Sequence, residues 1–380
     1  MSNYISSQIL GNGITVTGNN SWISHNTAEY NGNNGIFING NHATVYENTV
    51  NNNGSPVHST PCVPNFDISS ISEEMNNIRE EMNLHIAESQ NSTFMDELGC
   101  TNSEFFMNIV GELASLPTMA DYYSVLNNIY DGDVESKLLS LGEQGNGIEV
   151  LGDVTSISEN YAFNNGGYGI LVYGDIVTVD NNPQVTGNGG GIAVIGNYTH
   201  LTSNIVNEND WVGFYVRSDI GSDGLSHSGI KDCTANYNGI GMVVSGVVYV
   251  ASCQANHNKL DGILAIGDYS AIDIHPFYLC NGLEFNEVND NGANGIYSHG
   301  NNAIALNDGS GNSLVGIMID GNPLLLAAPN SVNGVIGSSM PPTAQLLQLA
   351  GYLTGIYGIV EFVLDRVPEY LSSLQSGFNS

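Results

Sequence analysis

The chain contains very few basic residues. Its 380 residues include six Lys and Arg against 38 Asp and Glu, which gives a formal net charge of −32 at pH 7. A protein that binds nucleic acid needs a basic surface, so this balance excludes nucleic-acid partners. The same repulsion disfavours long acidic polysaccharides and anionic membranes unless divalent cations bridge the contact.

Cysteine motifs and a leader segment are also lacking. The five Cys residues form no CxxC pair, which excludes a zinc ribbon. The chain opens with MSNYISSQIL, which carries no basic charge and no long apolar run, so it predicts no secretory signal peptide. The chain is then intracellular, exported by another route, or a mature or truncated form.

Glycine is abundant, with 46 residues, and it marks a repeat. Each repeat segment has a Gly, an apolar residue and then alternating residues, which is the pattern of a short half-buried strand. The four starts from Gly147 to Gly213 are evenly spaced, and the first two starts have the same spacing. Corners rich in Asn and Gly close each coil, because both tolerate left-handed backbone. The ten segments begin at Gly13, Gly35, Gly147, Gly169, Gly191, Gly213, Gly241, Gly262, Gly295 and Gly316.

Stacking of these coils places equivalent residues in columns. An Asn recurs at the same distance after five of the starts, which predicts a ladder of amides that satisfies buried corner groups. Cys233 and Cys253 occupy the matching position in two successive coils, about one strand spacing apart. This spacing allows either two stacked free thiols or a disulfide. The predicted ladder contains Asn26, Asn48, Asn160, Asn182 and Asn204.

The repeat resembles the right-handed parallel β-helix superfamily, whose members include pectin and pectate lyases, C5-epimerases, phage tailspikes and surface adhesins. The resemblance covers residues 8–54 and 145–340. It implies an all-β fold with about ten coils. It does not imply an activity, because the repeated Gly and Asn residues are architectural.

Two segments depart from the repeat. Residues 55–144 carry apolar residues at helical spacing, such as Ile71, Met75 and Ile78, and are predicted to be an inserted helical subdomain. Such an insertion either packs laterally or docks a partner. Residues 341–380 are predicted to be a helical C-terminal cap, and the polar Gln345 and Glu361 argue against a membrane span. The first β-helical coils are then residues 1–54, and the main β-helix is residues 145–340.

Candidate chemistry gathers near two smaller interruptions of the repeat, in the coils that begin at Gly213 and Gly262 and reach the next start later than the regular coils do. Lyases and epimerases of the superfamily use a Lys, Arg, His or Tyr base, with positive charge or Ca²⁺ to neutralise a uronate. The chain departs from the family patterns, with neither a DPH motif nor the paired Asp of polygalacturonases at matching positions. Asp219 and Asp223 could hold Ca²⁺, although their spacing matches no known loop, and no other cofactor is expected. The candidate catalytic residues are Arg217, Asp219, Asp223, His227, Lys231, Asp232, Asp273, His275 and Tyr278.

Two function classes follow. The favoured one is a non-catalytic β-helix that serves as a structural, adhesive or filament subunit, is extracellular or surface-associated, and could bind neutral glycans. It could self-associate through the rod ends or the insertion. The alternative is a polysaccharide lyase, hydrolase or epimerase with its site near Arg217 and His275. Four tyrosines are candidates for stacking on sugar rings: Tyr173, Tyr198, Tyr215 and Tyr297.

Overall fold

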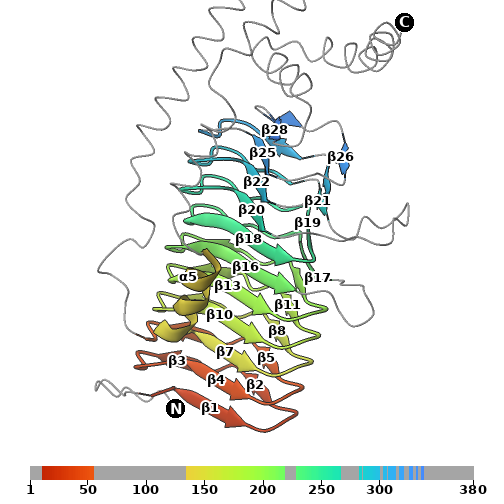
Figure 1. The fold of residues 1–380 in the computed structure, drawn as a ribbon. Helices are drawn as coiled ribbons and strands as arrows, with labels where there is room; N and C mark the ends of the chain where they lie inside the picture. The colour runs from red at the N-terminus through yellow and green to blue at the C-terminus, as the bar shows by residue number, and fades with distance from the viewer. Residues whose placement is uncertain are drawn as a thin grey trace, which may run out of the picture. The chain divides into compact units, whose positions relative to one another are not determined.

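The chain winds into stacked coils of short strands. The computed structural model describes residues 11–54, 134–218, 228–266, 282–284 and 286–299, and shorter pieces between 303 and 337. Strands of successive coils pair in parallel and form long sheets (Figure 1).

The first sheet holds the strands that follow the repeated glycines. Its order runs from one coil to the next, and β7, β10, β13 and β16 pair in parallel with no shift, as the repeat predicts. Ten of the eleven strands follow the ten predicted starts, and β28 adds one that the repeat did not predict. The strands are β1 (Ile14–Thr17), β4 (Ile36–Asn39), β7 (Ile148–Leu151), β10 (Tyr168–Tyr173), β13 (Gly190–Ile195), β16 (Val212–Ser218), β18 (Ile240–Gly246), β20 (Ile263–Ile266), β22 (Ile296–His299), β25 (Ile317–Asp320) and β28 (Val335–Gly337).

The second sheet holds the next strand of each coil. Its strands are β2 (Trp22–Ser24), β5 (Thr44–Tyr46), β8 (Ser156–Ser158), β11 (Thr178–Asp180), β14 (His200–Thr202), β17 (Ser228–Lys231), β19 (Val248–Ala251), β21 (Gly282–Glu284), β23 (Ala303–Ala305) and β26 (Leu325–Ala327).

The third sheet is shorter and ends in single bridges. Its strands are β3 (Thr27–Glu29), β6 (Thr49–Asn51), β9 (Tyr161–Phe163), β12 (Gln184–Thr186) and β15 (Val206–Asn207). Parallel bridges continue this column through Thr234, Gln254 and Glu287. A separate pair follows, β24 (Asp308–Gly309) with β27 (Ser331–Val332).

Alternating apolar residues fill the interior of the coils. In one coil Ile148 and Val150 of β7, Ile157 of β8 and Ala162 of β9 are all fully buried. Each fully buried Ile or Val contributes roughly 1.5–3 kcal/mol. The three short strands of a coil are therefore stabilised together, because their apolar side chains are buried in one shared interior.

The repeated glycine at each start has a packing reason. A Cβ on Gly35 would lie 2.7 Å from the carbonyl oxygen of Gly147 in the next coil and 2.6 Å from the amide nitrogen of Asn53. Contacts this short are not tolerated, so only Gly lets the coils approach while an Asn packs beside the strand. The repeat is thus a consequence of close backbone contact.

The long interruption leaves and rejoins the stack at one place. β4 pairs directly with β7, although the whole predicted insertion lies between them in the chain, and the register is unbroken. Gly54 and Gly145 touch there, both with positive φ, and a Cβ on Gly145 would collide with the Gly54 Cα. Any other residue would separate the two ends of the interruption.

Only the end of the predicted helical insertion is described. It contains α5 (Val134–Leu141) and the short 3₁₀ turn η1 (Gly142–Gln144). The Tyr168 hydroxyl donates to the Leu138 carbonyl at 2.9 Å and anchors α5 to the first sheet. The rest of the predicted insertion, residues 55–133, and the predicted cap at 341–380 lie outside the described residues. No helix in the described part is long and apolar enough to cross a membrane.

Candidate functional site

The corner between the second and third sheets is built on a ladder of asparagines. Each side-chain oxygen accepts the amide hydrogen of the Asn in the coil before it, over 3.0 Å from Asn26 to Asn48 and 2.8 Å from Asn182 to Asn204. The backbone N–H of the earlier Asn donates to the same oxygen. The ladder predicted from the sequence is confirmed. We refer to it as the first ladder.

The residue before each ladder position points outward. Its φ lies between 50° and 56°, so the backbone is left-handed and the side chain leaves the corner toward solvent. Non-glycine residues adopt this conformation at a cost of about 1 kcal/mol, which the buried amide bonds offset. The column contains His25, Glu47, Glu159, Asn181, Ser203, Asp232 and Ser252.

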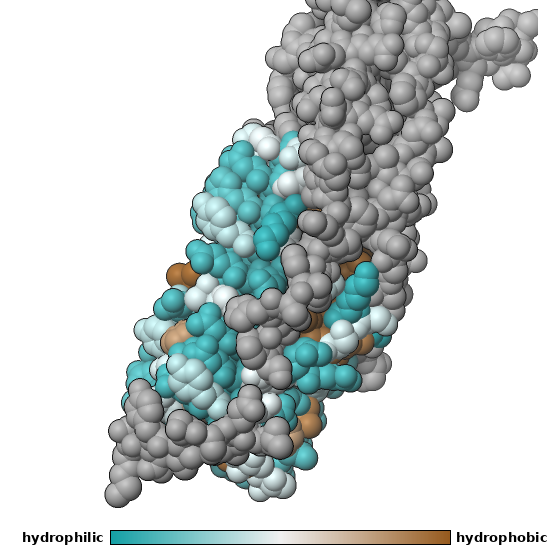
Figure 2. Space-filling view, turned by 90° about the vertical axis from the view of Figure 1, so that its left-hand side faces the viewer, coloured by the Kyte–Doolittle hydropathy of each residue, from teal (hydrophilic) through white to brown (hydrophobic). Residues whose placement is uncertain are grey.

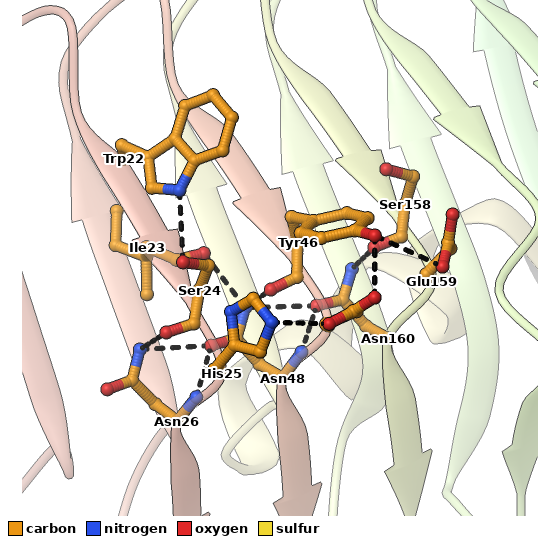
Figure 3. Close-up of polar contacts among 11 residues, drawn as sticks. Trp22, Ile23, Ser24, His25, Asn26, Tyr46, Asn48, Ser158, Glu159 and Asn160 are labelled. Atoms are coloured by element: carbon orange, nitrogen blue, oxygen red, sulfur yellow. Dashed lines mark hydrogen bonds and ion pairs between the residues drawn. The ribbon is translucent and has the colours of Figure 1, made fainter.

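Four side chains meet where this column passes the first coils (Figure 3). The Tyr46 hydroxyl donates to Glu47 Oε1 at 2.5 Å and lies 3.4 Å from Glu159 Oε2. His25 Nε2 is 2.5 Å from Glu47 Oε2, and its ring meets the Tyr46 ring edge-on at 5.8 Å. The two carboxylates therefore lie no more than about 6 Å apart across Tyr46, a limit that includes the spacing in retaining glycosidases.

Tyr46 stays a neutral phenol in this cluster. Its hydrogen bond to Glu47, with burial and the charges of Glu159 and Glu47, raises the pKa of Tyr46 to about 12. A phenol with this pKa is fully protonated at neutral pH, so Tyr46 is not a general base there.

An open groove begins beside the two carboxylates. It has a volume of about 450 Å³ and is lined by Glu47, Thr49, Glu159, Tyr161, Asn181 and Pro183. Tyr161 stands outward on β9 and is 43% exposed, and Trp22 on β2 is 70% exposed. The lining combines flat aromatic surface with hydrogen-bond acceptors and has no basic residue among the residues that the structure describes.

Comparison with known families gives one match. Residues 125–276 match the family model described as right handed beta helix region, which is less than half of the 380-residue chain. The protein is a right-handed parallel β-helix. Comparisons with curated proteins and with solved structures gave no match. This fold includes enzymes and non-catalytic proteins, so the match does not decide the activity.

The β-helix places the predicted basic residues on different sheets. Arg217 lies near the end of β16 of the first sheet, 3.9 Å from Glu135 of α5. Lys231 ends β17 of the second sheet, where its neighbour Asp232 lies 4.0 Å away. Arg217 and Lys231 therefore each lie next to a different carboxylate. The other predicted site residues lie outside the described part of the chain: Asp219, Asp223, His227, Asp273, His275 and Tyr278.

The predicted stacking tyrosines differ in exposure. Tyr215 and Tyr297 are buried, at 0% and 8% exposure, so neither offers a free ring face. Burial raises the pKa of Tyr215, and the carboxylate of Glu135 in α5 adds to the shift. Tyr173 and Tyr198 are half-buried.

The cluster of Tyr46, Glu47 and Glu159 was not predicted from the sequence. Glu47 and Glu159 each precede a ladder Asn, and this shared position was the signal available in the sequence. The cluster contains no bulge and no Lys or Arg, which are the features that pointed to residues 217–278 instead. No group of three or more His, Cys, Asp or Glu that could hold a metal occurs among the residues that the structure describes.

One side of the β-helix has a mostly polar surface. On the face shown in Figure 2, the described residues are mostly hydrophilic and hydrophobic ones appear in small groups. Small apolar groups are ordinary on protein surfaces and do not indicate a large protein interface.

Proposed function

We propose that the protein is a non-catalytic β-helix that binds neutral glycans and serves as a structural or surface-associated subunit. The observation that carries the proposal is the groove beside Tyr161, Glu47 and Glu159. An aromatic ring offers an apolar face to the C–H side of a sugar, and carboxylates accept hydrogen bonds from its hydroxyls.

Charge selects the class of glycan. Two carboxylates beside the groove and a net charge of −32 repel uronates and sulfated sugars. An uncharged sugar carries no such penalty. The expected ligand is therefore a neutral oligosaccharide that lies along the corner between the second and third sheets and on the third sheet.

Support for a non-catalytic role comes from the separate positions of the cations. Eliminating a uronate substrate needs a base together with positive charge that neutralises the carboxylate. Arg217 and Lys231 lie on different sheets, and each neighbours a carboxylate. Tyr46 remains protonated near neutral pH. These features favour binding over elimination.

The binding test compares two exposed tyrosines. Titration calorimetry with neutral cello-, xylo-, manno- and galacto-oligosaccharides should detect binding by at least one, and oligogalacturonate should bind far more weakly. Tyr161→Ala should weaken binding at least tenfold. Tyr237→Ala is the matched control, because Tyr237 is 55% exposed but does not line the groove. Equal losses in both variants, or tighter binding of the uronate, would refute the proposal.

The spacing of Glu47 and Glu159 favours one second candidate, a retaining glycoside hydrolase. Such enzymes place an acid and a nucleophile about 5–5.5 Å apart. Release of reducing ends from neutral polysaccharides decides between the two. A hydrolase would show release that the Glu47→Gln and Glu159→Gln variants lose, whereas the binding proposal expects no release above that of these variants.

The structural role has its own test. Native mass spectrometry over a range of concentrations, with electron microscopy of the same samples, should show self-association of the full chain. Particles that stay monomeric at high concentration would leave glycan binding as the whole of the proposal.

A further inference from the structure

Two cysteines replace asparagines in the first ladder. Cys233 follows the rung of Asn204, Cys253 comes next, and the amides resume at Asn286. Asn204 donates its backbone N–H to Cys233 Sγ at 3.4 Å and its side-chain amide to the same sulfur at 3.8 Å. These contacts are longer than those between two amide rungs, so the Cys233 rung holds its coil more weakly.

The strand register places the two cysteines side by side. Lys231 pairs with Ala251 before them, and Thr234 bridges to Gln254 after them. Cys233 and Cys253 therefore occupy equivalent places on adjacent coils, with Cα atoms about 4.8 Å apart. This separation falls within the range of disulfides, roughly 4.4–6.8 Å. Both residues are free thiols in the structure, and each is 1% exposed.

We propose that Cys233 and Cys253 form a buried disulfide that replaces the missing amide contact between these two coils. The oxidant is a small-molecule disulfide such as oxidised glutathione. One thiolate attacks it and releases one reduced glutathione, and the second thiolate then attacks the mixed disulfide and releases the other. The two thiol protons end on the two glutathione molecules, and one S–S bond replaces another.

Burial determines when this bond forms. Glutathione cannot reach two sulfurs that are 1% exposed, so oxidation happens while the coils are still closing. Once formed, the bond is shielded from reductants until the protein unfolds. It ties the coil interrupted at residues 219–227, between β16 and β17, to the coil that follows, which precedes the coil interrupted at residues 267–281.

The test uses a full-length variant in which Cys62, Cys100 and Cys280 are changed to Ser. Refolding in oxidised glutathione should lower the intact mass by about 2 Da and leave no thiol that reacts under denaturing conditions. The same protein refolded in reductant should show two thiols and a melting temperature roughly 3–6 °C lower. The oxidised protein should keep its bond in dithiothreitol while it remains folded.

The control is the further change Cys253→Ser, which should remove both the mass difference and the melting difference between the two buffers. A second measurement covers the case in which the variant does not fold. Wild-type protein is then oxidised, alkylated in denaturant, cleaved at Met242 with cyanogen bromide and digested at acidic residues, and the Cys233 peptide should be linked to the Cys253 peptide. Two free thiols after oxidative refolding, or links from either residue to a different cysteine, would overturn the proposal.

Discussion

Two asparagine ladders run along the same coils, and only one is unbroken. The second ladder follows the third sheet, and every rung that the structure describes is an Asn. Its side-chain oxygens accept the backbone N–H of the previous rung at 2.9–3.2 Å. The first ladder has amides at both ends and two thiols in its middle. The second ladder contains Asn31, Asn53, Asn165, Asn188, Asn209, Asn238, Asn258, Asn291 and Asn312.

The difference shows what a rung must do. Each corner leaves a buried backbone N–H that needs an acceptor from the next coil. An amide supplies the acceptor and also donates to carbonyl groups of its own coil and of the coil before it. A thiol supplies a weaker acceptor over a longer distance. The fold therefore tolerates a weak rung in one corner while the other corner of the same coils keeps its amides, as Asn238 and Asn258 do.

The largest expected effect comes from breaking the unbroken ladder. Asn188 accepts two hydrogen bonds from Asn165 and donates to Asn209 and to two carbonyl groups. Asn188→Ala leaves several buried groups unpaired and should cost about 5 kcal/mol of unfolding free energy, measured in urea. Asn26→Ala, at the end of the first ladder, should cost only about 1 kcal/mol. Similar losses at the two sites would contradict this account.

A third column shows what a charged rung does. In four of the ten segments the residue before the repeated glycine is an Asn, and Asn12, Asn34 and Asn146 each accept a backbone N–H from the next coil. At another such position the residue is Asp261, which accepts the backbone N–H of Asn294. Burial raises the pKa of Asp261 to about 7, against hydrogen bonds from Asn294 that lower it. Between its unfolded and folded pKa values the unfolded carboxyl is ionised while the folded one keeps its proton. Stability should therefore fall as pH rises through this range.

Asp261→Asn should remove this dependence. The variant should match the wild type near pH 4 and exceed it at pH 8 by about 4 kcal/mol, because a shift of about three pKa units is lost. Urea denaturation at the two pH values measures the difference. Equal stabilities at pH 8 would mean that the carboxylate is well accommodated in the folded state.

The thiol rungs offer the reverse experiment. Changing Cys233 and Cys253 together to Asn should complete the first ladder and raise the unfolding free energy of the reduced protein by about 1–2 kcal/mol. The slot holds an Asn in the neighbouring coils, so the added volume should fit. The control is Asn258→Cys in the second ladder, which should lower stability. A loss in the double variant would show that this corner is narrower than the others.

The sequence determines the fold more fully than the site. Gly at the start of each coil and Asn at a fixed later position follow from backbone contact and buried amides, so their spacing predicts sheets and ladder alike. The second ladder was not predicted, because Asn is also expected at tight corners for its backbone conformation alone. The cluster at Tyr46 depends on which outward residues happen to be neighbours between coils. The periodicity predicts the column to which each outward residue belongs, but it does not predict which of these residues form a functional cluster.

The smallest effect concerns the exposed residue beside a ladder rung. Glu47 and Asn48 are neighbours in the chain, but Asn48 is buried while the Glu47 carboxylate reaches Tyr46 and His25. Glu47→Gln should lower the pKa of Tyr46 from about 12 toward its ordinary value, because it removes the hydrogen bond that raises it most and one of the charges that add to the shift. Phenolate absorbance against a Tyr46→Phe reference measures this shift.

Glu208→Gln, in another corner column, is the control and should leave the Tyr46 pKa unchanged. An unaltered Tyr46 pKa in Glu47→Gln would mean that the hydrogen bond between Tyr46 and Glu47 does not form in solution. Glu47 would then not be a fixed hydrogen-bond acceptor beside the groove.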